Sequence, residues 1–167
     1  MVITQQHTGF IGLGANLGEP VTSIRSALDQ IALIEGVELI RSSSLYDSVP
    51  MGPSEQPNYI NAVCKIKATL SGLDLLHALQ RIENEHGRIR QGEHWGPRTL
   101  DLDLLILGTQ SYSTTELTLP HYGMRGREFV LVPLFELQPD LLMHDSQPIA
   151  KWVAECDVSQ LRRIHPK

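Results

Sequence analysis

Residues 95–103 read WGPRTLDLD and place two acids, Asp101 and Asp103, at the start of an apolar run. In a β-strand, side chains alternate between two faces, so both acids share one face, with Cα atoms about 6.6 Å apart, and the neighbouring leucines share the other. Two carboxylates held side by side repel each other unless a cation lies between them, and oxygen ligands favour Mg²⁺ over zinc. The stretch therefore predicts a strand with a core face and an Mg²⁺-binding face, which a phosphate substrate would complete. The alternative is that both acids form the solvated face of an amphipathic strand.

The patterns around this strand predict an α+β fold. The elements expected before it are a buried strand at 9–14, a helix from Pro20 to Gly36, a β-like segment at 37–46, a half-buried strand at 59–67 and a helix from Ser71 to Gly87. The order β-α-β-β-α-β is that of a ferredoxin-like antiparallel sheet with helices packed on one face. Because 167 residues with 41% hydrophobic content suit one core, we expect a single domain over residues 1–167.

Two irregular segments near the acids have the composition of functional loops. Residues 48–57 are rich in proline and glycine, and residues 87–96 mix glycines with charged side chains, which is typical of a mobile lid. The strand at 59–67 is expected to carry Tyr59 and Asn61 on an exposed face. The other predicted elements are a hairpin at 108–113, a short helix at 129–137 and a C-terminal helix near 149–153.

The charge balance argues against a general binder of nucleic acids or anionic membranes, because Lys and Arg total 14 against 19 acids and the formal net charge is -5. The arginines are unevenly spread, however. Clustered guanidinium groups suit a compact polyanion such as a nucleoside triphosphate, although solvated helix faces would also explain them. The two clusters are Arg81, Arg88, Arg90 and Arg98, and Arg125 and Arg127.

The cysteines and the first residues predict a cytoplasmic protein. Cys64 and Cys156 are far apart and form no C-x-x-C pair, so neither a zinc site nor a disulfide framework is expected. Residues 1–8 contain no basic segment followed by an apolar core, and no run approaches the roughly 18 apolar residues of a spanning helix. We therefore expect neither secretion nor membrane insertion.

Common nucleotide-binding and catalytic motifs are incomplete. The glycines of residues 12–18 miss the G-x-G-x-x-G spacing by one residue, so this segment is interpreted as a tight turn. No P-loop and no nucleophile-elbow serine motif occurs. His86 and His94 are too far apart for a helical metal pair, and a lone histidine such as His121 is more often structural than catalytic.

A series of short blocks carries a family resemblance. They are PMGP at 50–53 with QP at 56–57, YINA at 59–62, QRIE at 80–83, GRIR at 87–90, WGPRTLDLD at 95–103, and PHY at 120–122 with Arg127 and Phe129. In this order they closely resemble the 6-hydroxymethyl-7,8-dihydropterin pyrophosphokinase family of folate synthesis, over about residues 9–140.

The resemblance implies a specific reaction. Such an enzyme, a 2-amino-4-hydroxy-6-hydroxymethyldihydropteridine diphosphokinase, transfers pyrophosphate from ATP to the hydroxymethyl oxygen of the pterin and releases AMP. The acids that match Asp101 and Asp103 hold two Mg²⁺ ions on ATP. A two-metal clamp activates the attacking hydroxyl and neutralises charge on the phosphates, so no side-chain base is required. The implied partners are ATP and the pterin, and we expect a monomer.

The resemblance also implies roles for individual residues. Tyr59 and Phe129 would sandwich the flat pterin, Asn61 would read its amide edge, and Arg88 and Arg90 would close over the phosphates and act with the two acids in catalysis. The implied pterin-binding residues are Ser48, Val49, Met51, Tyr59, Asn61, Trp95 and Phe129. The implied ATP-binding residues are Gln80, Glu83, Arg90, Trp95, Arg98, Leu104, Thr118, His121, Tyr122 and Arg127.

Two positions depart from the family pattern. Val49 stands where a proline is common, and Glu116 stands where a basic residue can approach the nucleotide. An acid near the nucleotide would repel it unless a neighbouring cation or solvent screens the charge.

Two alternatives remain open at this level. A ferredoxin-like RNA-binding module would stack bases on aromatic residues of its sheet, although the acidic balance and the missing aromatic-rich motif argue against it. A D-x-D nucleotide-sugar transferase would also use paired acids, although 167 residues leave little room for its acceptor region. Release of AMP rather than ADP from ATP and the pterin separates the three hypotheses.

Overall fold

An antiparallel sheet organises the chain in a computed structural model that describes residues 5–50, 55–87 and 99–164. Five strands follow the spatial order β5-β1-β4-β3-β8, and β2 also pairs with β4. The strands are β1 (His7–Ala15), β2 (Val37–Ser42), β3 (Leu45–Ser48), β4 (Tyr59–Ala68), β5 (Asp101–Leu107) and β8 (Arg162–Ile164). The ferredoxin-like βαββαβ order is confirmed, with β2 and β3 together in the place of its second strand.

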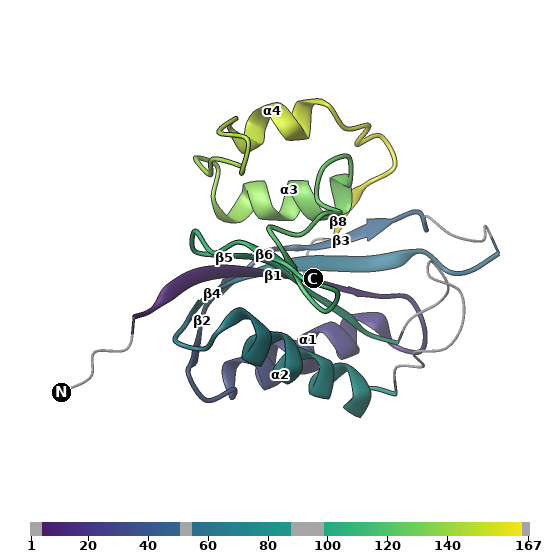
Figure 1. Cartoon of the computed structure of the whole chain (residues 1–167). Helices are drawn as coiled ribbons and strands as arrows, with labels where there is room; N and C mark the ends of the chain where they lie inside the picture. Colours follow the sequence, from purple (N-terminus) through teal and green to yellow (C-terminus); the bar gives the residue numbers. More distant parts are fainter. Residues whose placement is uncertain (1–4, 51–54, 88–98, 165–167) are drawn as a thin grey trace.

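Helices cover both faces of this sheet (Figure 1). Helices α1 (Pro20–Ala32) and α2 (Gly72–Glu85) lie below it, and α3 (Glu128–Leu137) and α4 (Ile149–Ala154) lie above it. The expectation that helices pack on one face is therefore wrong. The α+β class stands, but the last third of the chain adds a layer that the β-α-β-β-α-β order does not contain.

Each layer has its own apolar core. Ile11 and Leu102 belong to the cluster that contains α1 and α2 side chains, whereas Phe10, Val63 and Leu105 belong to the cluster that contains α3 and α4 side chains. Because both faces of the central strands are covered, β4 is buried on both sides, and its expected half-exposed character is also corrected.

The β-like segment at 37–46 is interrupted where a side chain replaces a backbone partner. The backbone N–H of Ser43 donates to the carbonyl of Val63 at 2.8 Å, and the N–H of Val63 donates to Ser43 Oγ at 2.9 Å. A serine can serve the backbone in this way, so the chain bends between β2 and β3 without leaving β4.

Three of the four predicted helix ends are confirmed, but α1 ends at Ala32 rather than at Gly36. Pro20 opens α1, and the Ser71 hydroxyl accepts the N–H of Asp74 at 3.1 Å at the start of α2. The chain leaves α2 through Gly87, whose φ of 78° favours glycine.

The hairpin expected at 108–113 lies one element later. Strand β5 pairs with β1, and the two-stranded hairpin joins β6 (Tyr112–Ser113) to β7 (Thr118–Leu119). None of the helices in the described part of the chain is long and apolar enough to cross a membrane.

Candidate active site

The two acids share one face of β5, as the alternation predicts. Asp101 and Asp103 are half-buried, whereas Leu102 and Leu104 are buried in the core. The carboxylates therefore stand on a rigid element at the end of the outer strand β5.

Two glycines of β1 lie opposite these acids, so β1 itself places no side chain beside them. Gly14 pairs with Asp101, and Gly12 pairs with Asp103, in the register of β1 and β5. Residues paired in this way point to the same face, so the central strand offers bare backbone next to both carboxylates. Because both glycines lie inside β1, the interpretation of residues 12–18 as a tight turn is wrong over its first part.

One register row joins the acids to Asn61. Asp101 pairs with Gly14, Gly14 with Asn61, and Asn61 with Tyr46, across the four strands β5, β1, β4 and β3. At about 4.8 Å between strands, Asn61 lies about 10 Å from the Asp101 backbone on the same face. The Asn61 side chain reaches over the intervening Gly14, where a Cβ would lie 3.1 Å from Asn61 Oδ1.

The side chain of Asn61 is held in a fixed orientation. Its Nδ2 donates to Ser48 Oγ at 2.6 Å, and both residues are buried. The expectation that Asn61 lies on an exposed face is wrong, because the side chain is only 5% exposed and is bonded to Ser48 of β3. Tyr59 is half-buried on β4, two residues before Asn61 and on the same face, and Phe129 is half-buried on α3.

A carboxylate of α3 ties this helix to the row. Glu136 accepts the hydroxyl of Tyr46 at 2.6 Å and the N–H of Ser44 at 2.9 Å. Burial and the adjacent Glu136 carboxylate raise the pKa of Tyr46 far above its usual value, so the phenol stays protonated and donates. The helix that carries Phe129 is thus anchored to β3, which carries Ser48.

His121 lies beside the acids as a neutral ring. Its backbone N–H donates to the Leu105 carbonyl at 2.9 Å, and its Nδ1 accepts the N–H of Gly123 at 3.0 Å. The remaining proton is therefore on Nε2, which lies 3.9 Å from Asp103 Oδ1. Burial lowers the pKa of His121, the Arg127 charge lowers it further, and Asp101 acts in the opposite direction. The ring is then a hydrogen-bond donor toward the acidic face rather than a cation.

Glu83 approaches the same strand from α2. The residue is 1% exposed, and its Oε2 accepts the backbone N–H of Leu102 at 2.8 Å. The bond falls on the residue between the two acids, a placement that the sequence pattern did not predict.

The other predicted site residues are spread around this centre. Gln80 is half-buried on α2, Thr118 is exposed on β7, Tyr122 is exposed and stacked on His121, and Val49 is exposed after β3. The Leu104 side chain is buried in the core, so it cannot reach a ligand on the acidic face. Met51, Arg88, Arg90, Trp95 and Arg98, and the predicted lid from residue 88 on, lie outside the described residues.

Asn16 is a site-forming residue that the sequence analysis did not single out. It follows β1, is buried, and its Nδ2 donates to Gln56 Oε1 at 2.9 Å and to the Pro57 carbonyl at 3.0 Å. It thereby fastens the end of the loop at 48–57 to the end of the central strand. The sequence feature that could have identified Asn16 is its place directly after a buried-strand pattern.

The departure at Glu116 has a local partner. Its Oε2 lies 2.8 Å from Nε2 of His77 on α2, within hydrogen-bond distance and on the exposed surface. The carboxylate is therefore engaged by a histidine of the same chain.

The donor set fits a magnesium ion that shares its ligands with a substrate. No group of three or more His, Cys, Asp or Glu side chains suited to a metal occurs among the described residues. Two carboxylates on one strand leave most coordination positions to water and phosphate oxygens, which is the usual arrangement for Mg²⁺ in nucleotide sites.

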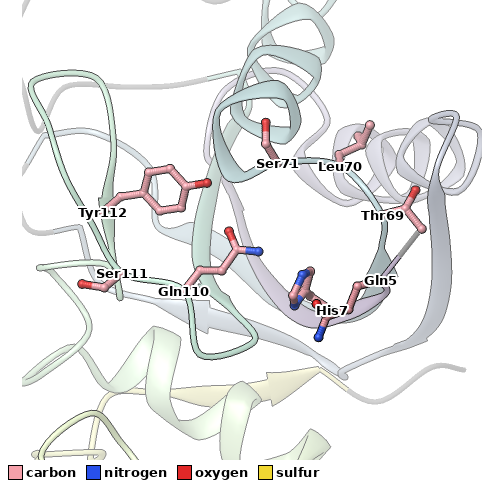
Figure 2. Close-up of a pocket in the computed structure, with 8 residues that line it drawn as sticks. All are labelled: Gln5, His7, Thr69, Leu70, Ser71, Gln110, Ser111 and Tyr112. Carbon is pink, nitrogen blue, oxygen red and sulfur yellow. The ribbon is translucent and has the colours of Figure 1, made fainter. Parts of the chain in front are cut away.

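A cavity of about 580 Å³ lies away from this centre (Figure 2). His7, Gln110 and Tyr112 line it, and His7 begins β1 while Gly14 lies near its other end. Seven residues of strand span about 23 Å. The described residues that line the cavity include no acid, lysine or arginine, so they do not suit a triphosphate or its metal.

Comparison with known proteins agrees with this geometry. The model of the 7,8-dihydro-6-hydroxymethylpterin-pyrophosphokinase family matches residues 10–139. The chain belongs to this family. Two relatives named 2-amino-4-hydroxy-6-hydroxymethyldihydropteridine pyrophosphokinase match along most of their length. The Haemophilus influenzae relative is 46% identical over 95% of this chain and 99% of its own, and the Pseudomonas aeruginosa relative is 43% identical over 93% and 95%.

Solved structures share the fold. The wild-type Plasmodium falciparum HPPK-DHPS with pteroate superposes with a TM-score of 0.72 at 12% identity, over 93% of this chain and 43% of that chain. A further HPPK-DHPS in complex with substrates gives a TM-score of 0.68 at 13% identity, over 90% and 43%. The chain thus spans less than half of these longer chains, and the likeness shows the fold alone.

Proposed function

We propose that the chain carries out the pyrophosphokinase reaction of its family at the end of β5. It transfers pyrophosphate from ATP to 6-hydroxymethyl-7,8-dihydropterin, a step of folate synthesis, with release of AMP. The observation that supports this placement is the register row, in which an anchored amide, a glycine and the first of the paired acids share one face.

The pterin end of the site is assigned to Asn61 and its surroundings. A flat, polar heterocycle needs hydrogen bonds at its amide edge and apolar contact on its faces. Asn61 supplies a carboxamide whose orientation is fixed by Ser48, and Tyr59 and Phe129 supply aromatic rings from β4 and α3. A pterin held there would direct its hydroxymethyl group along the row toward Asp101.

The phosphate end is assigned to Asp101 and Asp103, with two Mg²⁺ ions. When bound, the metal draws negative charge from the phosphates and lowers the pKa of the attacking hydroxyl. The chain holds both carboxylates on a strand, so they need no reorganisation when ATP arrives. His121 offers its Nε2 proton toward the same face as a fixed hydrogen-bond donor.

Further parts of the proposal concern the protein as a whole. We propose one pyrophosphokinase domain that acts as a monomer in the cytoplasm. Both cysteines are free, and burial raises the pKa of Cys64 to about 12, so this thiol is inert.

The experiment that tests the proposal follows both nucleotide products. The chain is incubated with ATP, Mg²⁺ and 6-hydroxymethyl-7,8-dihydropterin, and AMP, ADP and the pterin diphosphate are quantified. Equal amounts of AMP and pterin diphosphate are expected, and both should disappear on removal of Mg²⁺ with a chelator. ADP as the main product would contradict pyrophosphoryl transfer.

A further inference from the structure

Strand β5 is an outer strand, so half of its backbone groups need partners other than β1. Two of these groups bond to other parts of the chain. The N–H of Leu102 donates to Glu83 of α2, and the carbonyl of Leu105 accepts the N–H of His121. The acids Asp101 and Asp103 flank the first of these anchor points.

The Glu83 anchor is chemically unusual, because the carboxylate is buried. Removing a carboxylate from water is unfavourable unless it is well paired, whereas its hydrogen bond to a backbone N–H is short and strong. An apolar side chain would fill the same space without that penalty. An acceptor at this position also gives the Leu102 backbone a fixed location, which an apolar side chain would not.

Fixing Leu102 fixes the two acids. Each carboxylate is attached to a residue directly bonded to Leu102, so a shift of this backbone unit moves both carboxylates and changes their separation. A metal site tolerates such changes poorly, because the distances between a metal ion and its ligands vary over only a narrow range. Because the Leu102 N–H points away from β1, Leu102 lies opposite Leu13 as a non-hydrogen-bonded pair, and Glu83 supplies the hydrogen bond that β1 does not.

We infer that Glu83 is a positioning residue that fixes the backbone between Asp101 and Asp103, so that both carboxylates meet Mg²⁺ at one separation. This inference rests on the proposed function of the two acids. In this role Glu83 acts through the backbone of β5, which is distinct from a direct contact with ATP.

Two variants of Glu83 test separately whether the length of its side chain or its negative charge matters. Glu83→Gln loses the charge but keeps an oxygen at the same reach, so it can still accept the Leu102 N–H. Glu83→Asp keeps the charge but is one methylene shorter, so it cannot reach at the same geometry. We expect Glu83→Asp to raise the Mg²⁺ concentration for half-maximal activity by about tenfold or more, the usual size of outer-shell effects, while Glu83→Gln stays within about threefold.

Two readouts do not depend on turnover. Amide hydrogen exchange at Leu102, measured without ligands, should accelerate in Glu83→Asp and stay close to wild type in Glu83→Gln. The KM for the pterin at saturating Mg²⁺ should change by less than about twofold in both, because the pterin end is not touched. Leu75→Ala, in the core under the other end of α2, controls for lost stability and should leave the Mg²⁺ dependence unchanged.

Each opposite result has a distinct meaning. If Glu83→Gln fails and Glu83→Asp works, the charge of Glu83 matters and the positioning role is wrong. If Mg²⁺ dependence and Leu102 exchange are unchanged in both, the bond has no positioning effect. If Asp101→Asn and Asp103→Asn also retain normal Mg²⁺ dependence, the proposed function of the acids fails instead.

Discussion

A methyl group added at Gly14 should weaken pterin binding while leaving the fold intact. A Cβ at this position would lie 3.1 Å from Asn61 Oδ1, closer than an ordinary contact. Asn61 cannot simply slide away, because its Nδ2 already donates to Ser48 Oγ at 2.6 Å. The carboxamide must therefore shift by a few tenths of an ångström or rotate.

The size of the effect follows from the hydrogen bond at stake. Misplacing one buried amide group relative to its ligand costs about 1–3 kcal/mol. We expect Gly14→Ala to weaken pterin binding by about tenfold, which corresponds to about 1.4 kcal/mol. Global stability should change by no more than about 1 kcal/mol, because alanine reduces the freedom of the unfolded chain and Gly14 does not have a positive φ.

Gly12 provides the matched control. It lies two residues earlier on the same face of β1, and a Cβ there meets only Leu105 side-chain atoms, the nearest at 3.6 Å. Calorimetric titration of wild type, Gly12→Ala and Gly14→Ala with the pterin, in the presence of a non-hydrolysable ATP analogue and Mg²⁺, checks the prediction. Equal losses in both variants would show that a methyl anywhere on this strand blocks the site and would refute the argument from Asn61.

Three further outcomes are expected. Asp103→Asn should lower kcat by about 10²-fold or more. Its thermal unfolding midpoint should stay within a few degrees of wild type, because the acid lies on the partly exposed face of β5. Near-normal turnover at saturating Mg²⁺ would argue against Asp103 as a metal ligand. Burial, and then the Arg127 charge, lower the pKa of His121 in the folded chain. As the pH falls below about 6.5, the unfolded state therefore binds a proton before the folded state does, and the free energy of unfolding should decrease. Denaturant titrations from pH 7 to 5 should show a smaller decrease for His121→Gln than for wild type. Glu116→Gln should change ATP affinity by less than about twofold at low salt, because the carboxylate is 58% exposed and already paired with a histidine of α2; a tenfold gain would place it against the nucleotide.

The parts of the site that the sequence predicts are those set by neighbouring residues. The alternation of Asp101 and Asp103 with leucines needs only strand geometry, and the Ser71 cap needs only the first turn of a helix. Both appear in the structure as expected. The family resemblance also predicts the reaction, because a long sequence motif together with other motifs in the expected order is more specific than the periodicity of apolar residues.

The parts that the sequence does not predict depend on contacts between distant segments. Asn61 has the local pattern of an exposed residue, yet it is buried and bonded to Ser48, which lies 13 residues earlier in the chain. Glu83 lies in an ordinary helical pattern, and its bond to Leu102 spans 19 residues. The break at Ser43 likewise arises from a bond to Val63. Periodicity contains no information about such partners.

The second helical layer has a consequence for when activity can arise during synthesis. Strands β1 to β5 and helices α1 and α2 use residues up to 107, and they already contain both acids and Asn61. Phe129, His121, the Glu136 anchor and strand β8 all arrive with the last third of the chain. A growing chain can therefore form the strands that carry the acids and Asn61 while it is still catalytically silent. Turnover is a reporter of one late folding event, the docking of α3 against β3, and not of the formation of the strands that carry the acids.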